Sequence, residues 1–104
     1  MIITTSQTIA DRKISKTLGL VRGNTIRARH VGKDIKAAFR HIIGGEITEY
    51  TKLMGESREQ AIDRMVAQAQ ALGANAIEAA NFSTSMIMGG AAEILAYGTA
   101  VVVE

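Results

Sequence analysis

Residues 76–103 read AIEAANFSTSMIMGGAAEILAYGTAVVV, two apolar runs separated by a Gly-Gly pair. Because Gly89-Gly90 suits a two-residue turn of type I′, the runs Ala76–Ile87 and Ala92–Val103 are predicted to form a β-hairpin. That turn places Phe82 opposite Tyr97, an aromatic cross-strand pair of the kind that stabilises sheets, and both side chains are expected to form part of the core. The same register gives three further pairs: Ile77 with Val102, Ala79 with Ala100, and Glu78 with Val101. Both faces of the hairpin are then largely apolar.

A long helix is predicted before the hairpin, from about Glu46 to Leu72, with Gly73 ending it. Its apolar positions keep one phase at about 3.6 residues per turn; they are Ile47, Tyr50, Met54, Ala61, Met65, Ala69 and Leu72. Ser57-x-x-Gln60 also matches a capping box, which would start a helix at Arg58 instead. We favour the single long helix, although Gly55 inside it costs about 1 kcal/mol.

The first half of the chain is predicted to supply two strands and a shorter helix. Ile2–Ile9 is a short strand, and Ile14–His30 is a longer one that Gly19 and Gly23 break or bulge. A helix from Lys33 or Asp34 to Ile43 follows, because apolar residues recur there at helical spacing. The order is therefore that of an α+β domain covering residues 1–104.

Composition limits the class of protein. The chain has 104 residues, 47% of them hydrophobic, and no cysteine, which fits one globular domain and excludes disulfide or cysteine-based zinc scaffolds. The start of the chain lacks the features of a signal peptide, and the longest apolar stretch, Ile94–Val103, is too short to cross a bilayer. We expect a cytoplasmic protein.

Charge is sorted along the sequence. Residues 12–40 contain nine Lys or Arg and one acid, a net charge of +8, whereas residues 41–104 carry −5. The basic part could face a polyanion, or it could meet the acidic surface of another copy. Alternation in the second strand puts Arg27 and Arg29 on one face, so these two residues are the candidate anion-facing pair. Other bases that could contribute are Arg22, Lys33, Lys36 and Arg40. Nucleic acid is the less favoured partner, since no aromatic residues interleave with the bases.

Candidate metal ligands are few. The two histidines, His30 and His41, are too few for a zinc site within one subunit. Met86 and Met88 could attract a soft ion such as Cu(I), although methionines near a hairpin tip more often fill space. We therefore predict no tight transition-metal site and retain these four residues as candidates.

No catalytic residues are recognised. The sequence lacks a Gly-x-Ser-x-Gly elbow and any ordered Ser, His and Asp set. Glu59 and Asp63 lie four residues apart on the long helix, where two acids could share a proton. With Arg58 and Arg64 beside them, a solvated face with ion pairs is the alternative that we favour. The sequence favours a non-catalytic protein.

Several segments together resemble one family, the YbjQ-like proteins, small bacterial and archaeal proteins to which heavy-metal binding is attributed. The matching segments run in order along nearly the whole chain: Leu18-Gly19-Leu20-Val21-x-Gly23, Asp34, Phe39, Ile42-Ile43-Gly44-Gly45, Tyr50, Arg58-x-x-Ala61, Leu72-Gly73-Ala74-Asn75-Ala76 and Ala96-Tyr97-Gly98-Thr99-Ala100-Val101. Two positions depart from the family pattern, Glu46 and Glu78.

The resemblance implies a β-β-α-α-β-β subunit with an antiparallel sheet packed on a long helix. The implied subunit is dodecin-like in broad shape and is expected to assemble as a ring of five copies. The resemblance brings no established catalytic residues, and the cofactor, if there is one, is unknown at this point. The leading hypothesis is a non-catalytic homo-oligomeric ring that binds a small ligand in a central or inter-subunit cavity. A heavy-metal-binding protein and a polyanion-binding module are the alternatives.

Overall fold

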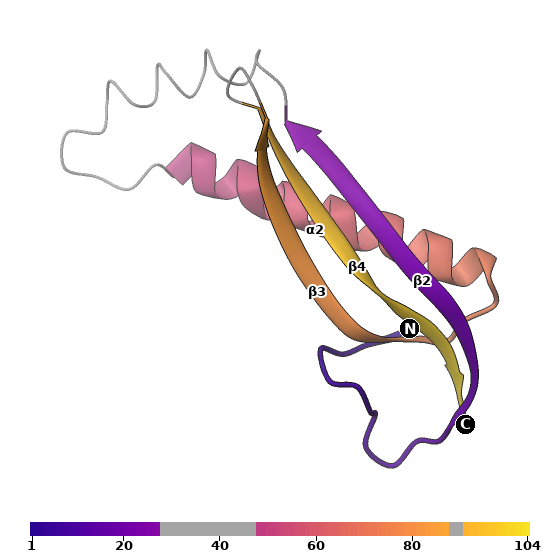
Figure 1. Ribbon diagram of the computed structural model, residues 1–104. Coiled ribbons are helices and arrows are strands. Elements are labelled where there is room, and N and C mark those ends of the chain that lie inside the picture. The colour runs from indigo at the N-terminus through magenta and orange to yellow at the C-terminus, as the bar shows by residue number, and fades with distance from the viewer. Residues whose placement is uncertain (28–47, 88–90) are drawn as a thin grey trace.

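A computed structural model describes residues 1–27, 48–87 and 91–104 (Figure 1). Its elements are β1 (Ile2–Ile3), β2 (Ile14–Arg27), α2 (Thr48–Ala71), β3 (Ala76–Ile87) and β4 (Ala91–Val103). The strands form one sheet in the order β1-β3-β4-β2, and α2 crosses behind it in the view of Figure 1. The predicted helix at 33–43 and the Gly89-Gly90 turn lie outside the described residues.

The sheet is mixed, which corrects the prediction of an antiparallel one. β1 pairs with β3 in parallel through Ile2–Ala76 and Ile3–Ile77. It is also much shorter than the predicted Ile2–Ile9. The Thr4 and Ser6 hydroxyls hydrogen-bond to each other at 2.7 Å, and the Thr4 hydroxyl accepts from the Ser6 backbone N–H at 3.2 Å. Such local bonds compete with a strand ladder, so the strand ends early.

The two glycines of β2 have different roles. The register with β4 shifts between Thr17 and Gly19, and Gly19 has a φ of +119°, so the predicted bulge there is confirmed. Gly23 pairs regularly with Ala96, and the break predicted there is wrong. A Cβ on Gly23 would lie 2.2 Å from the backbone oxygen of Ala61 and 2.4 Å from the backbone nitrogen of Met65. Gly23 is therefore the point where α2 packs directly on the backbone of β2.

The long helix is confirmed. α2 runs unbroken through Gly55 and Ser57, and Gly73 follows its end with a φ of +87°, the left-handed conformation that glycine favours. Ser57 is fully buried, and its hydroxyl donates to the backbone oxygen of Leu53 at 2.9 Å. It therefore lies inside the helix and not at an N-cap, because tertiary packing outweighs the local capping signal.

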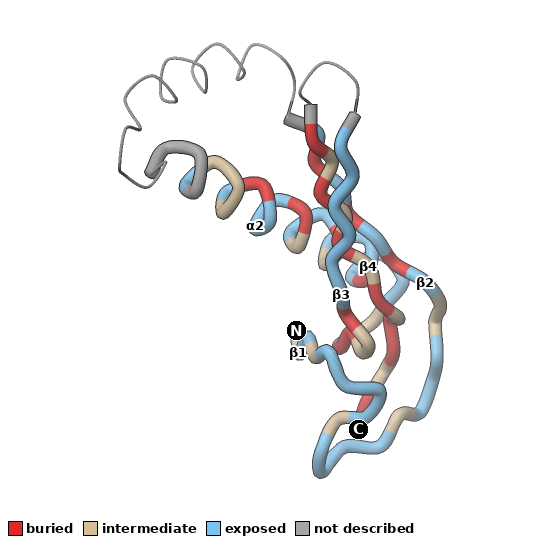
Figure 2. Tube along the Cα trace, turned by 60° about the vertical axis from the view of Figure 1, so that its left-hand side comes forward, coloured by how far each residue is buried: buried red, intermediate tan, exposed pale blue. Residues whose placement is uncertain are grey.

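The core lies mainly between α2 and the sheet. Small side chains dominate it, and its buried members are Val21, Ala61, Met65, Ala69, Ile77, Ala80, Ile94, Ala96 and Ala100. At the chain termini, a second cluster of Ala76, Val101 and Val103 packs on the opposite face against Ile2, Ile9 and Ile14. In Figure 2 the buried residues follow β4 and one side of α2, whereas much of β3 is exposed.

The hairpin of β3 and β4 is confirmed, but its predicted register is wrong. Ile87 pairs with Ala91, so the connection is one residue longer than the predicted turn. A further shift between Glu78 and Asn81 includes Ala79, whose φ is +53°. Because each one-residue shift moves side chains to the other face, the predicted pairs do not form.

The observed partners differ for every predicted pair: Phe82 lies opposite Ala96, Tyr97 opposite Asn81, Ile77 opposite Ala100, and Glu78 opposite Thr99. Phe82 shares the helix-side face with Ala96, whereas Tyr97 lies on the other face. Phe82 is 46% exposed. The predicted place of this residue in the core is therefore also wrong.

Candidate functional site

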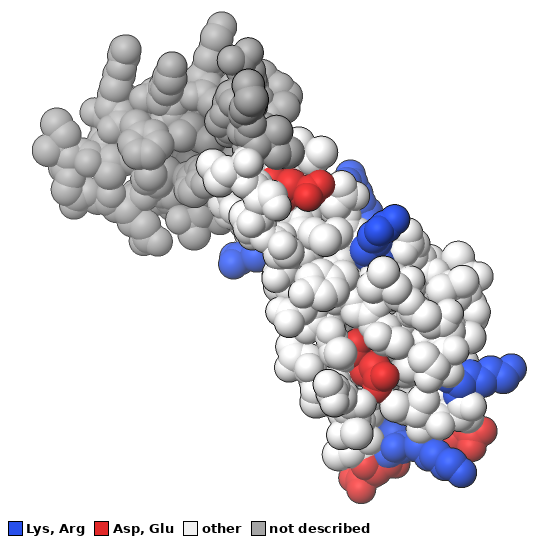
Figure 3. All heavy atoms as spheres, in the orientation of Figure 1, with Lys and Arg blue, Asp and Glu red and all other residues white. Residues whose placement is uncertain are grey.

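The face of the sheet opposite α2 is only partly covered. Val21 and Thr25 are buried on the helix side of β2, so the even-numbered residues that alternate with them point the other way. On this side Leu20 is 66% exposed and Ile26 is 54% exposed. We call this surface the open face; its residues on β2 and β4 are Leu20, Arg22, Asn24, Ile26, Glu93, Leu95, Tyr97 and Thr99. In Figure 3, which views this side, uncharged atoms predominate between isolated charged groups.

Both signs of charge occur on or beside the open face. Asn24 Nδ2 donates to Glu93 Oε2 at 3.3 Å, and the exposed Arg22 side chain makes no ion pair with a described residue. Glu78 lies opposite Thr99, where the open face meets the part covered by the N-terminal segment. Its Oε2 atom is buried, and no described residue donates a hydrogen bond to it. A buried carboxylate oxygen without a donor costs free energy in the folded subunit. A hydrogen-bond donor near Glu78 would therefore be stabilising.

The free edges of the sheet are protected by side chains. On β2, the Arg22 backbone N–H donates to Gln68 Oε1 at 2.9 Å, and Arg64 Nη1 donates to the backbone oxygen of Asn24. On β3, the Phe82 backbone N–H donates to Asn81 Oδ1 at 3.1 Å. These contacts occupy backbone groups that a further strand would use. The open face is therefore a better surface for contact with another protein than either edge of the sheet.

A cleft of about 170 Å³ lies on the helix side of the sheet, between β3, α2 and the residues that follow β1. Met65, Ala80 and Ala96 are almost fully buried there, whereas Phe82 is half-exposed. The other residues that line it are Ile3, Thr4, Thr5, Ile62 and Asn81. All nine are uncharged. This cleft was not predictable from the sequence, because the shift at Ala79 that turns Phe82 toward α2 has no sequence signal.

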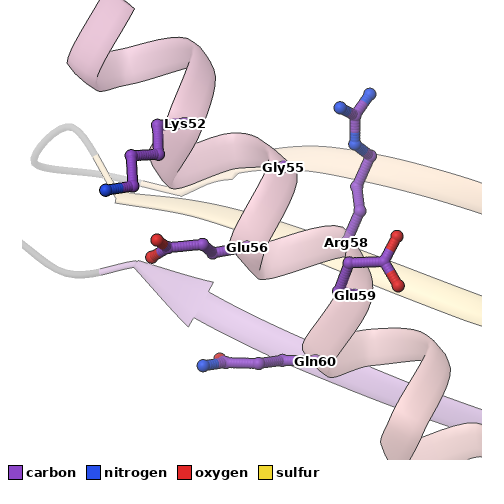
Figure 4. Close-up of a pocket in the computed structure, with 6 residues that line it drawn as sticks. All are labelled: Lys52, Gly55, Glu56, Arg58, Glu59 and Gln60. Atoms are coloured by element: carbon purple, nitrogen blue, oxygen red, sulfur yellow. The ribbon is translucent and has the colours of Figure 1, made fainter.

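A shallow hollow on α2 carries the charged helix residues (Figure 4). It is lined by Lys52, Gly55, Glu56, Arg58, Glu59 and Gln60, which all belong to one stretch of the helix. The carboxylates of Glu56 and Glu59 point to different sides. Glu59 and Asp63 are both exposed. This arrangement fits the solvated helix face rather than an acid pair that shares a proton.

The predicted metal and anion residues are mostly outside the described part of the chain. This holds for His30, His41, Met88 and Arg29. Met86 lies on β3 and is 74% exposed, and Arg27 is the last residue of β2. Within residues 1–27, 48–87 and 91–104, no three His, Asp or Glu side chains gather into a metal-binding group. The metal and anion roles stay predictions.

One signal in the sequence could have identified the open face. Gly23 marks the side of β2 on which the helix packs, so the residues at even positions, Leu20 and Ile26 among them, must point away from it.

No helix within the described residues is long and apolar enough to span a membrane.

Comparisons with known proteins agree with the resemblance. A family model described as "Putative heavy-metal-binding" matches residues 1–104. A UPF0145 protein of Methanosarcina acetivorans is 58% identical over 101 residues, which cover 97% of this chain and 95% of that protein. A UPF0145 protein of Dehalococcoides mccartyi is 58% identical over 104 residues and 100% of both chains.

A solved structure shares the fold. It is a protein of unknown function from Pediococcus pentosaceus, assigned to the DUF74 family. The match has a TM-score of 0.67 and covers 100% of this chain and 98% of that one, at 17% identity. At this identity the likeness concerns the fold alone.

Proposed function

The chain belongs to the YbjQ-like family, and we propose that it is a non-catalytic binding protein that assembles into a closed homo-oligomer through its open face. The exposure of Leu20 and Ile26 on that face is the observation that carries the proposal. Soluble monomers rarely leave large apolar patches in water. The family resemblance implies a ring of five copies.

The composition of the open face supports a second copy as the partner. Arg22 lacks an ion-pair partner among the described residues, and Glu78 Oε2 lacks a donor. The cation on β2 and the acceptor on β3 are unlike groups at separate places, so two copies can meet head to tail, the kind of contact that closes into a ring. In this arrangement Arg22 of one copy meets the partly exposed side chain of Glu78 of the next, and burial of Leu20 and Ile26 supplies most of the affinity. The charge pair fixes the orientation.

The test compares two exposed leucines. Leu20→Asp places a charge on the open face, whereas Leu72→Asp places one just beyond α2, where the leucine is 50% exposed and outside that face. Native mass spectrometry and light scattering give the mass of each. We expect a multiple of 11.1 kDa for the wild type and for Leu72→Asp, and a smaller species for Leu20→Asp. A wild-type monomer at micromolar concentration would overturn the proposal.

Heavy-metal binding is a second candidate, favoured by the description of the family model. Met86, highly exposed on β3, is the one candidate ligand with a described side chain. Thioethers bind soft ions such as Cu(I), but a tight site needs several of them. Titration of the metal-free protein with Zn(II), Cu(II) and Cu(I) separates this candidate from the first.

A further inference from the structure

We infer that the cleft between β3 and α2 binds a neutral, apolar molecule of about six or seven heavy atoms, such as a monocyclic hydrocarbon. The inference rests on the proposed binding function and names its ligand class. Volume is the first argument. The cleft measures about 170 Å³, close in size to an enclosed apolar cavity of about 150 Å³ in another protein that binds benzene.

The lining selects for neutral ligands. Six of its nine residues are apolar, and the other three, Thr4, Thr5 and Asn81, are uncharged. A charged ligand would lose its hydration here without meeting an opposite charge, and this loss is costly. Charged molecules of the same size should therefore be rejected.

The walls of the cleft are held in place by the fold. The Thr4 backbone N–H donates to the Ile77 oxygen, and the Ala80 N–H donates to the Thr4 oxygen, both at 2.9 Å. These two bonds fix the segment after β1 against β3. Met65 and Ala96 belong to the buried core and form the floor. A preformed site of this kind loses little entropy when a ligand binds.

The position of the cleft favours a small molecule over a neighbouring copy. The cleft lies on the helix side of the sheet, whereas the open face, with its exposed Leu20 and Ile26, lies on the opposite side. The surface proposed for assembly therefore leaves the cleft accessible. Each copy in an assembly would carry its own site.

Methyl-detected NMR of the full chain with toluene tests the inference. We expect shifts for the methyl groups of Ile3, Ile62 and Ala80, and none for Leu72, with a dissociation constant on the order of 1 mM. Benzoate and anilinium, which add a charge to the same ring, should produce no such shifts. Absence of toluene shifts, or equal shifts with benzoate, would overturn the inference.

Two variants localise the binding. Ala80→Leu fills the cleft from its β3 side and should weaken toluene binding by about tenfold or more, because the leucine side chain occupies the space of the ligand. Phe82→Ala removes one aromatic wall from a half-exposed position, and should weaken binding about threefold to tenfold. Leu72→Ala is the matched control and should bind like the wild type. Unchanged binding in both cleft variants would overturn the inference.

The assembly variant separates this inference from the proposed function. Toluene shifts in both the wild type and Leu20→Asp support a site within each subunit, even if the wild type proves monomeric. Shifts in Leu20→Asp alone would mean that a neighbouring copy fills the cleft in the assembly, and this outcome would overturn the inference.

Discussion

The side-chain amide of Asn75 pairs with the backbone of Val103 as a neighbouring strand would. Asn75 Nδ2 donates to the Val103 oxygen, and the Val103 N–H donates to Asn75 Oδ1, both at 2.8 Å. The pair joins the start of β3 to the end of β4. It thereby stabilises the end of the sheet where Ala76, Val101 and Val103 form the second core cluster.

Replacement of this amide should therefore destabilise the fold. Asn75→Ala should lower the free energy of unfolding by about 1–3 kcal/mol, because the backbone groups of Val103 lose their partners. Asn75→Asp should lose more at pH 7 than at pH 3, since only the protonated carboxyl can donate to the Val103 oxygen. Urea unfolding of each variant, relative to the wild type at the same pH, measures both effects. An Asp variant whose loss relative to the wild type is the same at the two pH values would contradict this account.

The two glycines Gly23 and Gly55 should respond in opposite ways to substitution by alanine. A Cβ at Gly23 would collide with the backbone of α2, so Gly23→Ala should destabilise by about 1–3 kcal/mol or more. At Gly55 the nearest atom is Arg58 Nη2 at 3.8 Å, so Gly55→Ala should stabilise the helix by about 0.5–1 kcal/mol. Thermal unfolding of both variants tests the pair, and a stable Gly23→Ala protein would show that the helix does not contact β2 as described.

Elements with a strong local period were predictable from the sequence. The helix from about Glu46 to Leu72 follows from a sustained helical period, and the hairpin strands follow from two apolar runs. The strand register was not predictable, because it depends on a connection one residue longer than a Gly-Gly turn and on Ala79, a non-glycine residue with a positive φ. The open face and the cleft both follow from register and packing, so neither could be identified from residue types alone.

The corrected position of Phe82 changes the expected stability of its variant. Since Phe82 is 46% exposed, Phe82→Ala should lower the free energy of unfolding by about 1–2 kcal/mol and not by the 3–5 kcal/mol typical of a buried phenylalanine. Ile77→Ala, at a fully buried position on the same strand, should cost about 2–5 kcal/mol. Urea unfolding of the two variants ranks them, and a larger loss for Phe82→Ala would mean that this side chain is buried in solution.

Metal titration should give no tight site. Calorimetry of metal-free protein with Zn(II), Cu(II) and Cu(I) is expected to show no binding at about micromolar concentration or tighter, because cysteine is absent and the histidines are only two. Binding at one ion per subunit or per ring, abolished by Met86→Ala or by His30→Ala with His41→Ala, would instead establish the heavy-metal candidate.

Charge exchange between Arg22 and Glu78 tests how the copies meet. Glu78→Arg alone would place two cations at the proposed contact, and Arg22→Glu alone would place two acids there, so each should weaken the assembly. The double variant restores opposite charges across the contact and should recover much of the wild-type mass in native mass spectrometry. If Arg22 and Glu78 only stabilised the fold of one subunit, the double variant should not recover the wild-type mass, because within one chain the two residues lie on separate strands with β4 between them.

Light scattering at about 0.1 M and 1 M salt adds a second measurement. If apolar burial of Leu20 and Ile26 supplies most of the affinity, the wild-type assembly should persist at 1 M salt, where exposed pairs are screened beyond about 3 Å. Dissociation at 1 M salt would show that charge contributes more than apolar burial. A double variant as weak as either single one would exclude the Arg22–Glu78 contact.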